Sequence, residues 1–157
     1  LCRWGDGGWS DVVKRGKQED HHFSDDLVEV LASRFEEWHT GEHPAWLTCV
    51  PSTRSGELVP DFAQRLADRL GIPFRAAVRK ARDTARQMEM QNTHQQGANV
   101  RGAFEIVEDL WLPGSVLLVD DIVDSRWTFT VIVALLKLQG CEAVHPLALA
   151  LNSPRMD

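Results

Sequence analysis

Two stretches of the chain carry apolar residues at the spacing of an amphipathic helix. The first is 24–39, where Ser24 and the two acids after it predict a helix N-cap. The second is 58–70, which Gly71 is expected to end. A third helix is expected over 128–140.

Short aliphatic and β-branched runs lie between these helices and predict strands. The runs are Trp46–Val50, 72–78, Phe104–Val107, Val116–Val119 and Ala143–Leu151. The run at 116–119 is aliphatic throughout, which is typical of a central parallel strand that is covered on both faces. Strands that alternate with helices predict an α/β fold, with a mostly parallel central sheet and helices on both faces.

Two segments show neither the helical spacing of apolar residues nor an apolar run that predicts a strand. Residues 1–23 are rich in Gly, Trp, Lys and Asp, and we expect them to form an irregular N-terminal arm or linker from upstream regions. The domain itself is then expected over 24–157. The first residue is Leu1 and not Met, which suggests a piece of a longer polypeptide. Residues 80–103 are polar, and a long polar segment within a compact domain is usually functional or mobile.

Composition limits the class of protein. A chain of 157 residues with 43% hydrophobic and 25% charged residues suits one soluble domain. Its apolar runs are far shorter than the roughly 20 residues that span a bilayer, so no membrane partner is expected. The three cysteines are distant from one another and form no C-x-x-C pair, which indicates neither a disulfide framework nor a metal site.

Charge is distributed unevenly along the chain. The net charge of −6 argues against a domain that coats nucleic acid over its whole surface. Between residues 79 and 101, however, five basic residues stand against two acids, so this segment would attract an anion. The candidate nucleic-acid contacts are Arg79, Lys80, Arg82, Arg86 and Arg101.

The sharpest chemical signal is the acid pair Asp120-Asp121, which comes directly after the aliphatic run. Ligands of open α/β sheets bind beyond the carboxyl ends of the strands. Two adjacent carboxylates at that place can accept hydrogen bonds from a vicinal diol, or hold Mg²⁺ through water. The start of the next helix can hold a phosphate.

The segment Val116–Thr128 resembles the phosphoribosyl pyrophosphate (PRPP) signature of type I phosphoribosyltransferases. Residues 99–104 are similar to ComF-type members of that superfamily, and 50–55 lie where it keeps a pyrophosphate loop. The resemblance implies a type I phosphoribosyltransferase-like fold, with Mg²⁺ accompanying a phosphate ligand. The implied ligand loop contains Asp120, Asp121, Asp124, Ser125, Arg126, Trp127 and Thr128. The implied pyrophosphate loop contains Pro51, Ser52, Thr53, Arg54 and Ser55.

The second half of the signature departs from the family pattern. Asp124 and Ser125 stand where the family has Thr-Thr, Arg126 where it has Gly, and Trp127 where it has a small residue. Asp124 would repel a phosphate about 4 Å away by roughly 4 kcal/mol at an effective dielectric near 20. Arg126 offsets part of this repulsion. We therefore assign no catalytic residue, and we expect a changed ligand or none in preference to retained transfer.

The chain as a whole resembles the C-terminal region of certain bacterial RecQ-type ATP-dependent DNA helicases. The segments that carry this resemblance are Leu1–Trp9, Lys14–Lys17, Cys49–Ser52, Leu58–Phe62, Met88–Asn92 and Asp120–Thr128. The resemblance implies a parent enzyme that unwinds DNA in replication, recombination or repair, with upstream helicase and winged-helix domains as partners. It also implies a cytoplasmic, nucleoid-associated location. This chain itself lacks a G-x-x-x-x-G-K-[ST] loop for ATP.

Three functional hypotheses remain open at this point. The chain is a helicase accessory domain that binds DNA or regulates the motor, with Trp127 stacking on an unpaired base. Alternatively, it is an active transferase or a sensor of PRPP or a nucleotide, which uses Asp120, Asp121 and Mg²⁺. In the third hypothesis it is a docking module whose Trp4 and Trp9 pack on the helicase body.

Overall fold

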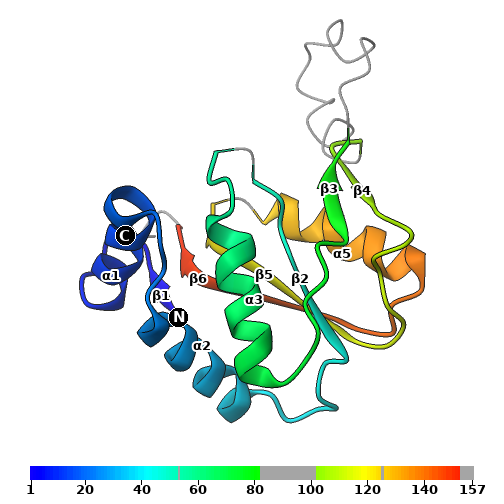
Figure 1. The fold of residues 1–157 in the computed structure, drawn as a ribbon, viewed down its shortest axis with the longest axis horizontal. Coiled ribbons are helices and arrows are strands. Elements are labelled where there is room, and N and C mark those ends of the chain that lie inside the picture. The colour runs from blue at the N-terminus through cyan, green and yellow to red at the C-terminus, as the bar shows by residue number, and fades with distance from the viewer. Residues whose placement is uncertain (53, 82–101, 125, 153–157) are drawn as a thin grey trace, which may run out of the picture.

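A four-stranded parallel sheet forms the centre of the protein. The structure is a computed structural model that describes residues 1–52, 54–81, 102–124 and 126–152. In them the sheet has the order β1-β6-β5-β2, and each neighbouring pair is parallel. The strands are β1 (Cys2–Arg3), β2 (Trp46–Cys49), β5 (Val116–Val123) and β6 (Val144–Leu151). The aliphatic run at 116–119 therefore lies in a central strand, as predicted (Figure 1).

Helices cover both faces of this sheet. They are α2 (Asp25–Trp38), α3 (Leu58–Leu70) and α5 (Trp127–Gln139). Side chains along β5 alternate between the faces. Leu117 and Val119 pack in a cluster with α2 and α3, whereas Val116 and Leu118 pack with Ile132 and other residues of α5. The predicted α/β architecture is confirmed. Of the helices in the described ranges, none has the length and apolar character needed to cross a bilayer.

The three helices lie close to their predicted boundaries. Ser24 occupies the N-cap position of α2, although its side chain makes no capping hydrogen bond. At the other end of α3, Gly71 has φ 70°, in the left-handed region where a Cβ atom is unfavourable. Its N–H donates to the Asp68 carbonyl at 3.2 Å, which ends the helix as the sequence indicated.

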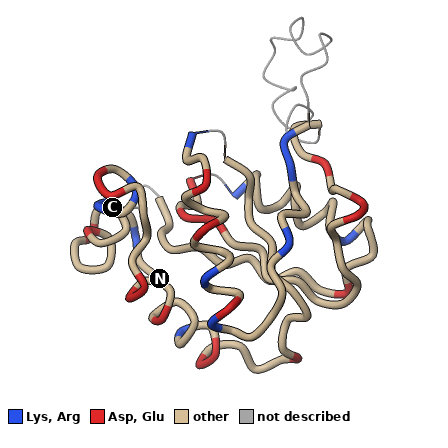
Figure 2. The backbone as a smooth tube through the Cα atoms, viewed as in Figure 1, with Lys and Arg blue, Asp and Glu red and all other residues tan. Residues whose placement is uncertain are grey.

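Arginines tie α2 to α3 across the outside of the molecule, where acidic and basic residues are interspersed (Figure 2). Arg69 Nε lies 2.6 Å from Glu29 Oε2. Arg65 has a more buried position and three kinds of partner. Its guanidinium donates to Asp25 at 2.8 Å, to Asp61 at 2.7 Å, and to the Phe23 carbonyl at 2.6 Å. These contacts fix the segment before α2 as well as the helix itself.

The N-terminal segment is structured, so the prediction of an irregular arm at 1–23 is wrong. Strand β1 joins the sheet beside β6, and after it come α1 (Trp9–Arg15) and a π-helix, η1 (Gly16–Asp20). Val13 and Phe23 are fully buried in the core cluster of α2 and α3. The seven-residue α1 buries only Ser10 and Val13, which is too short a pattern for a periodicity search.

A second small sheet lies outside the parallel one. Its strands β3 (Val78–Lys80) and β4 (Phe104–Ile106) pair antiparallel. The strand expected at 72–78 is therefore not continuous: Phe74 makes a single parallel bridge to Leu47, and Val78 already belongs to β3. The chain then leaves the sheet, and the Ala77 carbonyl accepts from Val107 N–H instead of from a parallel neighbour.

Candidate functional site

The connections after β2 and β5 leave the same end of the sheet. The last pair between these strands is Cys49↔Val119, and Val50 N–H donates to the Val119 carbonyl at 2.9 Å. Strand β5 continues beside β6 alone as far as Val123. Asp120 and Asp121 therefore lie where the β2 chain turns away, within a strand that runs four residues past its predicted end. On the β2 side, this part of β5 has no strand neighbour among the described residues, and ligands of α/β sheets bind beyond such strand ends.

The two acids differ in exposure and in partners. Asp121 is 5% exposed, and each of its oxygens accepts from a protein donor. Its Oδ1 accepts from Ile122 N–H at 2.7 Å, and its Oδ2 from Lys17 Nζ at 2.6 Å. Asp120 is half-buried, and its Oδ1 accepts from Asp121 N–H at 2.8 Å. The acid pair is thus in contact with the ammonium group of Lys17, which the sequence did not indicate.

Burial raises the pKa of Asp120 to about 7, and the neighbouring charge of Asp121 contributes to this rise, while Lys17 opposes it. Since Asp121 holds the ion pair with Lys17, we assign the proton to Asp120. Near neutral pH the site therefore alternates between two states. In one, Asp120 can donate a hydrogen bond, and in the other it only accepts.

Lys17 comes from η1, 104 residues away from its partner in the sequence. Its side chain is 31% exposed, so the ammonium contacts both the buried acid and solvent. Because 1–23 was expected to be a linker, this residue was absent from the predicted site. Within one sequence, the only available signal was the basic cluster at 14–17, which does not reveal a distant partner.

The loop after β2 is held by its own serine. Ser52 Oγ accepts from Arg54 N–H at 3.3 Å and from Ser55 N–H at 3.1 Å. Pro51, Ser52 and Ser55 are half-buried, and Arg54 is exposed. Thr53 lies outside the described residues. The loop thus begins at the end of the sheet that carries the acid pair, as its position after a neighbouring parallel strand predicted.

The first residue of the loop after β5 is tied to the end of β6. Asp124 is exposed, and its Oδ1 accepts from Asn152 Nδ2 at 2.8 Å, just beyond the end of β6. Ser125 lies outside the described residues. Arg126 and Trp127 are exposed, and Thr128 lies in the first turn of α5. The Arg126 carbonyl accepts from the hydroxyl of Thr130 at 2.9 Å.

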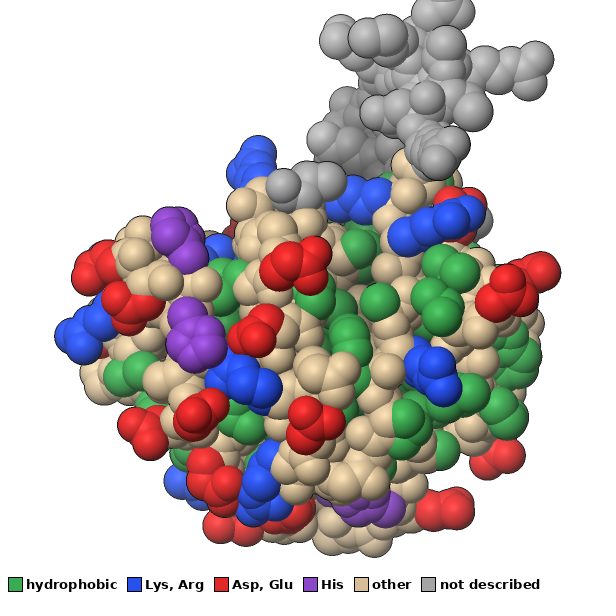
Figure 3. All heavy atoms as spheres, in the orientation of Figure 1, with side chains coloured by type: hydrophobic (Ala, Val, Ile, Leu, Met, Phe, Trp, Pro, Cys, Tyr) green, Lys and Arg blue, Asp and Glu red, His purple; other side chains and the backbone are tan. Residues whose placement is uncertain are grey.

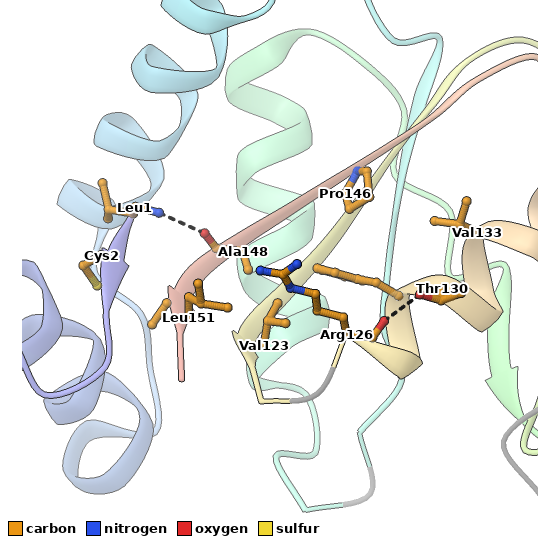
Figure 4. A pocket seen from close by; sticks show the side chains of 11 residues that line it. Leu1, Cys2, Val123, Arg126, Thr130, Val133, Pro146, Ala148 and Leu151 are labelled. Atoms are coloured by element: carbon orange, nitrogen blue, oxygen red, sulfur yellow. Dashed lines mark hydrogen bonds between the residues drawn. The ribbon is translucent and has the colours of Figure 1, made fainter. Parts of the chain in front are cut away.

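A cavity of about 590 Å³ lies between α5, β6 and the start of the chain. Figure 4 shows Arg126 extending from the start of α5 toward β6, where Ala148 and Pro146 contribute to the lining. Val123 is its only lining residue from β5, so neither acid lines it. Apart from Arg126, its lining side chains are mostly apolar and offer no carboxylate for a sugar diol. The acid pair is therefore the better candidate for sugar-phosphate chemistry.

Two of the five predicted nucleic-acid contacts are described, and both lie on β3. Arg79 Nε pairs with Glu105 Oε1 at 2.5 Å across the β3–β4 register. Lys80 is exposed at the end of the strand. The other three, Arg82, Arg86 and Arg101, lie outside the described residues. In the view of Figure 3, hydrophobic side chains gather over the part of the surface formed by β3, β4 and α5.

Metal-type donors do not cluster in the part of the chain that the structure describes. Within those ranges there is no group of three or more His, Cys, Asp or Glu side chains that could hold an ion. Cys2, Cys49 and Cys141 are free thiols, and the latter two are buried. Burial raises the pKa of Cys49 to about 12, with a further contribution from Asp120.

No protein-family model matches the sequence, and no curated protein matches it. Solved structures do match. An adenine phosphoribosyltransferase superposes with a TM-score of 0.59 at 20% identity, over 81% of this chain and 68% of that one. The adenine phosphoribosyltransferase of Saccharomyces cerevisiae, in complex with an imino-altritol bisphosphate and adenine, gives 0.58 at 20% identity over 81% and 67%.

The allosteric regulatory enzyme of purine biosynthesis superposes with a TM-score of 0.52 at 24% identity, over 78% of this chain. The chain spans a quarter of the length of that enzyme. At these identities the superpositions bear on architecture alone. They agree with the parallel sheet and with the helices on its two faces. The chain has the fold of the type I phosphoribosyltransferases.

Proposed function

We propose that this domain binds a phosphorylated ribose ligand of the PRPP type at the acid pair, as a phosphoribosyltransferase or as a sensor derived from one. The observation that carries the proposal is the position of Asp120 and Asp121. They lie on the central strand of this fold, at the point where β2 ends and the loop that contains Ser52 begins. This supports the transferase or sensor hypothesis more than the helicase hypothesis.

The chemistry of the pair suits a ribose diol. A carboxylate accepts hydrogen bonds from two adjacent hydroxyls, and hydrogen bonds to charged groups contribute about 1.5 to 3 kcal/mol each. Backbone N–H groups at the start of α5 would receive a phosphate. In the loop after β2, the N–H groups of Arg54 and Ser55 donate to Ser52 Oγ, so a phosphate bound there would have to replace that hydroxyl as their acceptor. The Asp124 carboxylate accepts from Asn152 Nδ2 at 2.8 Å, which fixes its position at the end of β6 while its negative charge remains.

Calorimetry with PRPP and with ribose 5-phosphate tests the proposal. We expect saturable binding by the wild type, weakened about 10-fold or more by Asp120→Asn, because about 1.4 kcal/mol corresponds to a factor of 10. The matched control is Asp109→Asn, the same change at an exposed acid between β4 and β5. Absence of heat with both ligands would overturn the proposal. Pyrophosphate release on adding a nucleobase would extend the function from binding to transfer.

We also propose, as a second candidate, that this domain is an accessory part of a RecQ-type helicase, which the whole-chain resemblance favours. The exposed Arg79 and Trp127 support contact with single-stranded DNA, since Trp127 is 56% exposed. Docking through Trp4 and Trp9 gains less support, because Trp4 packs against the core of this domain and Trp9 is the exposed one of the two. DNA affinity that falls steeply with salt supports this proposal, and absence of binding at low salt removes it.

A further inference from the structure

We infer that Lys17 takes the place of a divalent cation at the acid pair, so that the site binds its sugar-phosphate ligand without Mg²⁺. The inference rests on the proposed function for its ligand and adds a positioning residue that the sequence did not indicate. Its basis is the contact of Lys17 Nζ with Asp121 Oδ2 at 2.6 Å.

A buried pair of adjacent carboxylates needs a positive charge nearby, because desolvation and mutual repulsion both oppose ionisation. The ammonium of Lys17 supplies that charge to Asp121, whose side chain is only 7% exposed. With Lys17 included, the two acids and the lysine carry at most one net negative charge. One ionisable acceptor, Asp120, then remains to receive the hydroxyls of a sugar.

The donors present do not fit Mg²⁺. That ion requires near-octahedral oxygen ligands at about 2.0 to 2.1 Å. In this structure Asp121 Oδ1 accepts from Ile122 N–H and Asp121 Oδ2 from Lys17, so an ion would have to displace protein donors. It would also lie next to an ammonium, which repels it.

The fold holds Lys17 firmly in position. The preceding Gly16 is buried, and a Cβ atom there would lie 2.8 Å from the His22 carbonyl oxygen and 2.9 Å from Phe23 Cδ1. Gly16 and Lys17 both lie in the wide turn of η1, and Val13 and Phe23 are fully buried on either side of it. Pairing of β1 with β6 fixes the start of the segment (Figure 1). Lys17 is therefore part of the packed domain and not a loosely held surface lysine.

Two assays on the full chain test this inference. In the first, binding of ribose 5-phosphate is measured in EDTA and in Mg²⁺. We expect equal affinity for the wild type, a loss of about 10-fold or more for Lys17→Met in EDTA, and partial recovery in Mg²⁺. Lys14→Met, at an exposed lysine of the adjacent α1, is the matched control and should behave like the wild type. A requirement for Mg²⁺ in the wild type overturns the inference.

The second assay needs no sugar ligand. Mn²⁺ alone is titrated into the protein and followed by electron paramagnetic resonance. We expect no tight site in the wild type, and a new site in Lys17→Met that is lost again in Lys17→Met/Asp121→Asn. A tight wild-type site that Asp121→Asn abolishes overturns the inference even if no sugar phosphate binds. If neither PRPP nor ribose 5-phosphate binds and the wild type has no tight Mn²⁺ site, the proposed function alone is overturned. The wild-type measurements do not depend on the folding of any variant.

Discussion

Replacing Asp120 with Asn should flatten the dependence of stability on pH. Burial first, and then the charge of Asp121, raise the pKa of Asp120 from 3.8 to about 7. An acid with a higher pKa in the folded state binds its proton more tightly there than in the unfolded chain. The contribution of Asp120 to the free energy of unfolding is therefore largest below its unfolded pKa, and it is lost as pH rises through the folded value of about 7.

The size of this effect follows from the shift. Each pKa unit corresponds to about 1.36 kcal/mol, so the whole shift corresponds to at most about 4 kcal/mol. Between about pH 5 and about pH 8 the free energy of unfolding should fall by about 2 to 3 kcal/mol through Asp120, because the rest of its contribution is already lost below about pH 5. Asn carries no titrating proton, so the variant does not lose stability through ionisation at this position. It should therefore be the more stable protein at about pH 8.

Urea unfolding of the wild type and of Asp120→Asn, at several pH values across this window, measures the effect. The difference between the two proteins isolates Asp120, since histidines and other acids titrate in both. Curves that run parallel would show that Asp120 ionises normally in the folded protein. In that case the assignment of the proton to Asp120, and of the ion pair to Asp121, would be wrong.

Three further outcomes test the packing. Gly16→Ala should lower the free energy of unfolding by about 1 to 3 kcal/mol, because the added methyl group overlaps a backbone carbonyl. Thermal unfolding measures this change, and an unchanged midpoint temperature would contradict it. Arg65→Met should cost about 1 to 2 kcal/mol in urea unfolding, since it leaves the Phe23 carbonyl without this donor, and a neutral result would assign the contact no role in stability. Cys49, with its pKa raised to about 12, should resist alkylation at about pH 8 until the protein is unfolded, and rapid reaction of the native thiol would contradict its burial.

The spacing of apolar residues was sufficient to predict α2 and α3, each of which buries one apolar face. The central strand was predicted from its continuous aliphatic run instead. The position of the acid pair could be predicted from the same pattern, because a continuous aliphatic run indicates a covered strand. Residues that come directly after such a strand lie at the ligand-binding end of the sheet.

The N-terminal segment and the direction of β3 were not predictable in this way. Helix α1 has seven residues, and η1 has a wider turn than the period searched for. The partner of Lys17 is 104 residues away, so only the folded chain brings the two charges together. Strand β3 has three residues, and its antiparallel partner β4 is equally short. Such short strands take their direction from tertiary contacts.

The pairing of β1 with β6 affects the order in which the domain can assemble. Cys2 aligns with Ala150, so the first strand of the sheet has no neighbour until the last one has been synthesised. Contacts this distant in sequence form late, because a long loop has to close before they give any stabilisation. On the ribosome, the segment with Lys17 would therefore wait for nearly the whole domain to emerge before it docks. Ligand competence should accordingly be among the last properties that a newly made chain acquires.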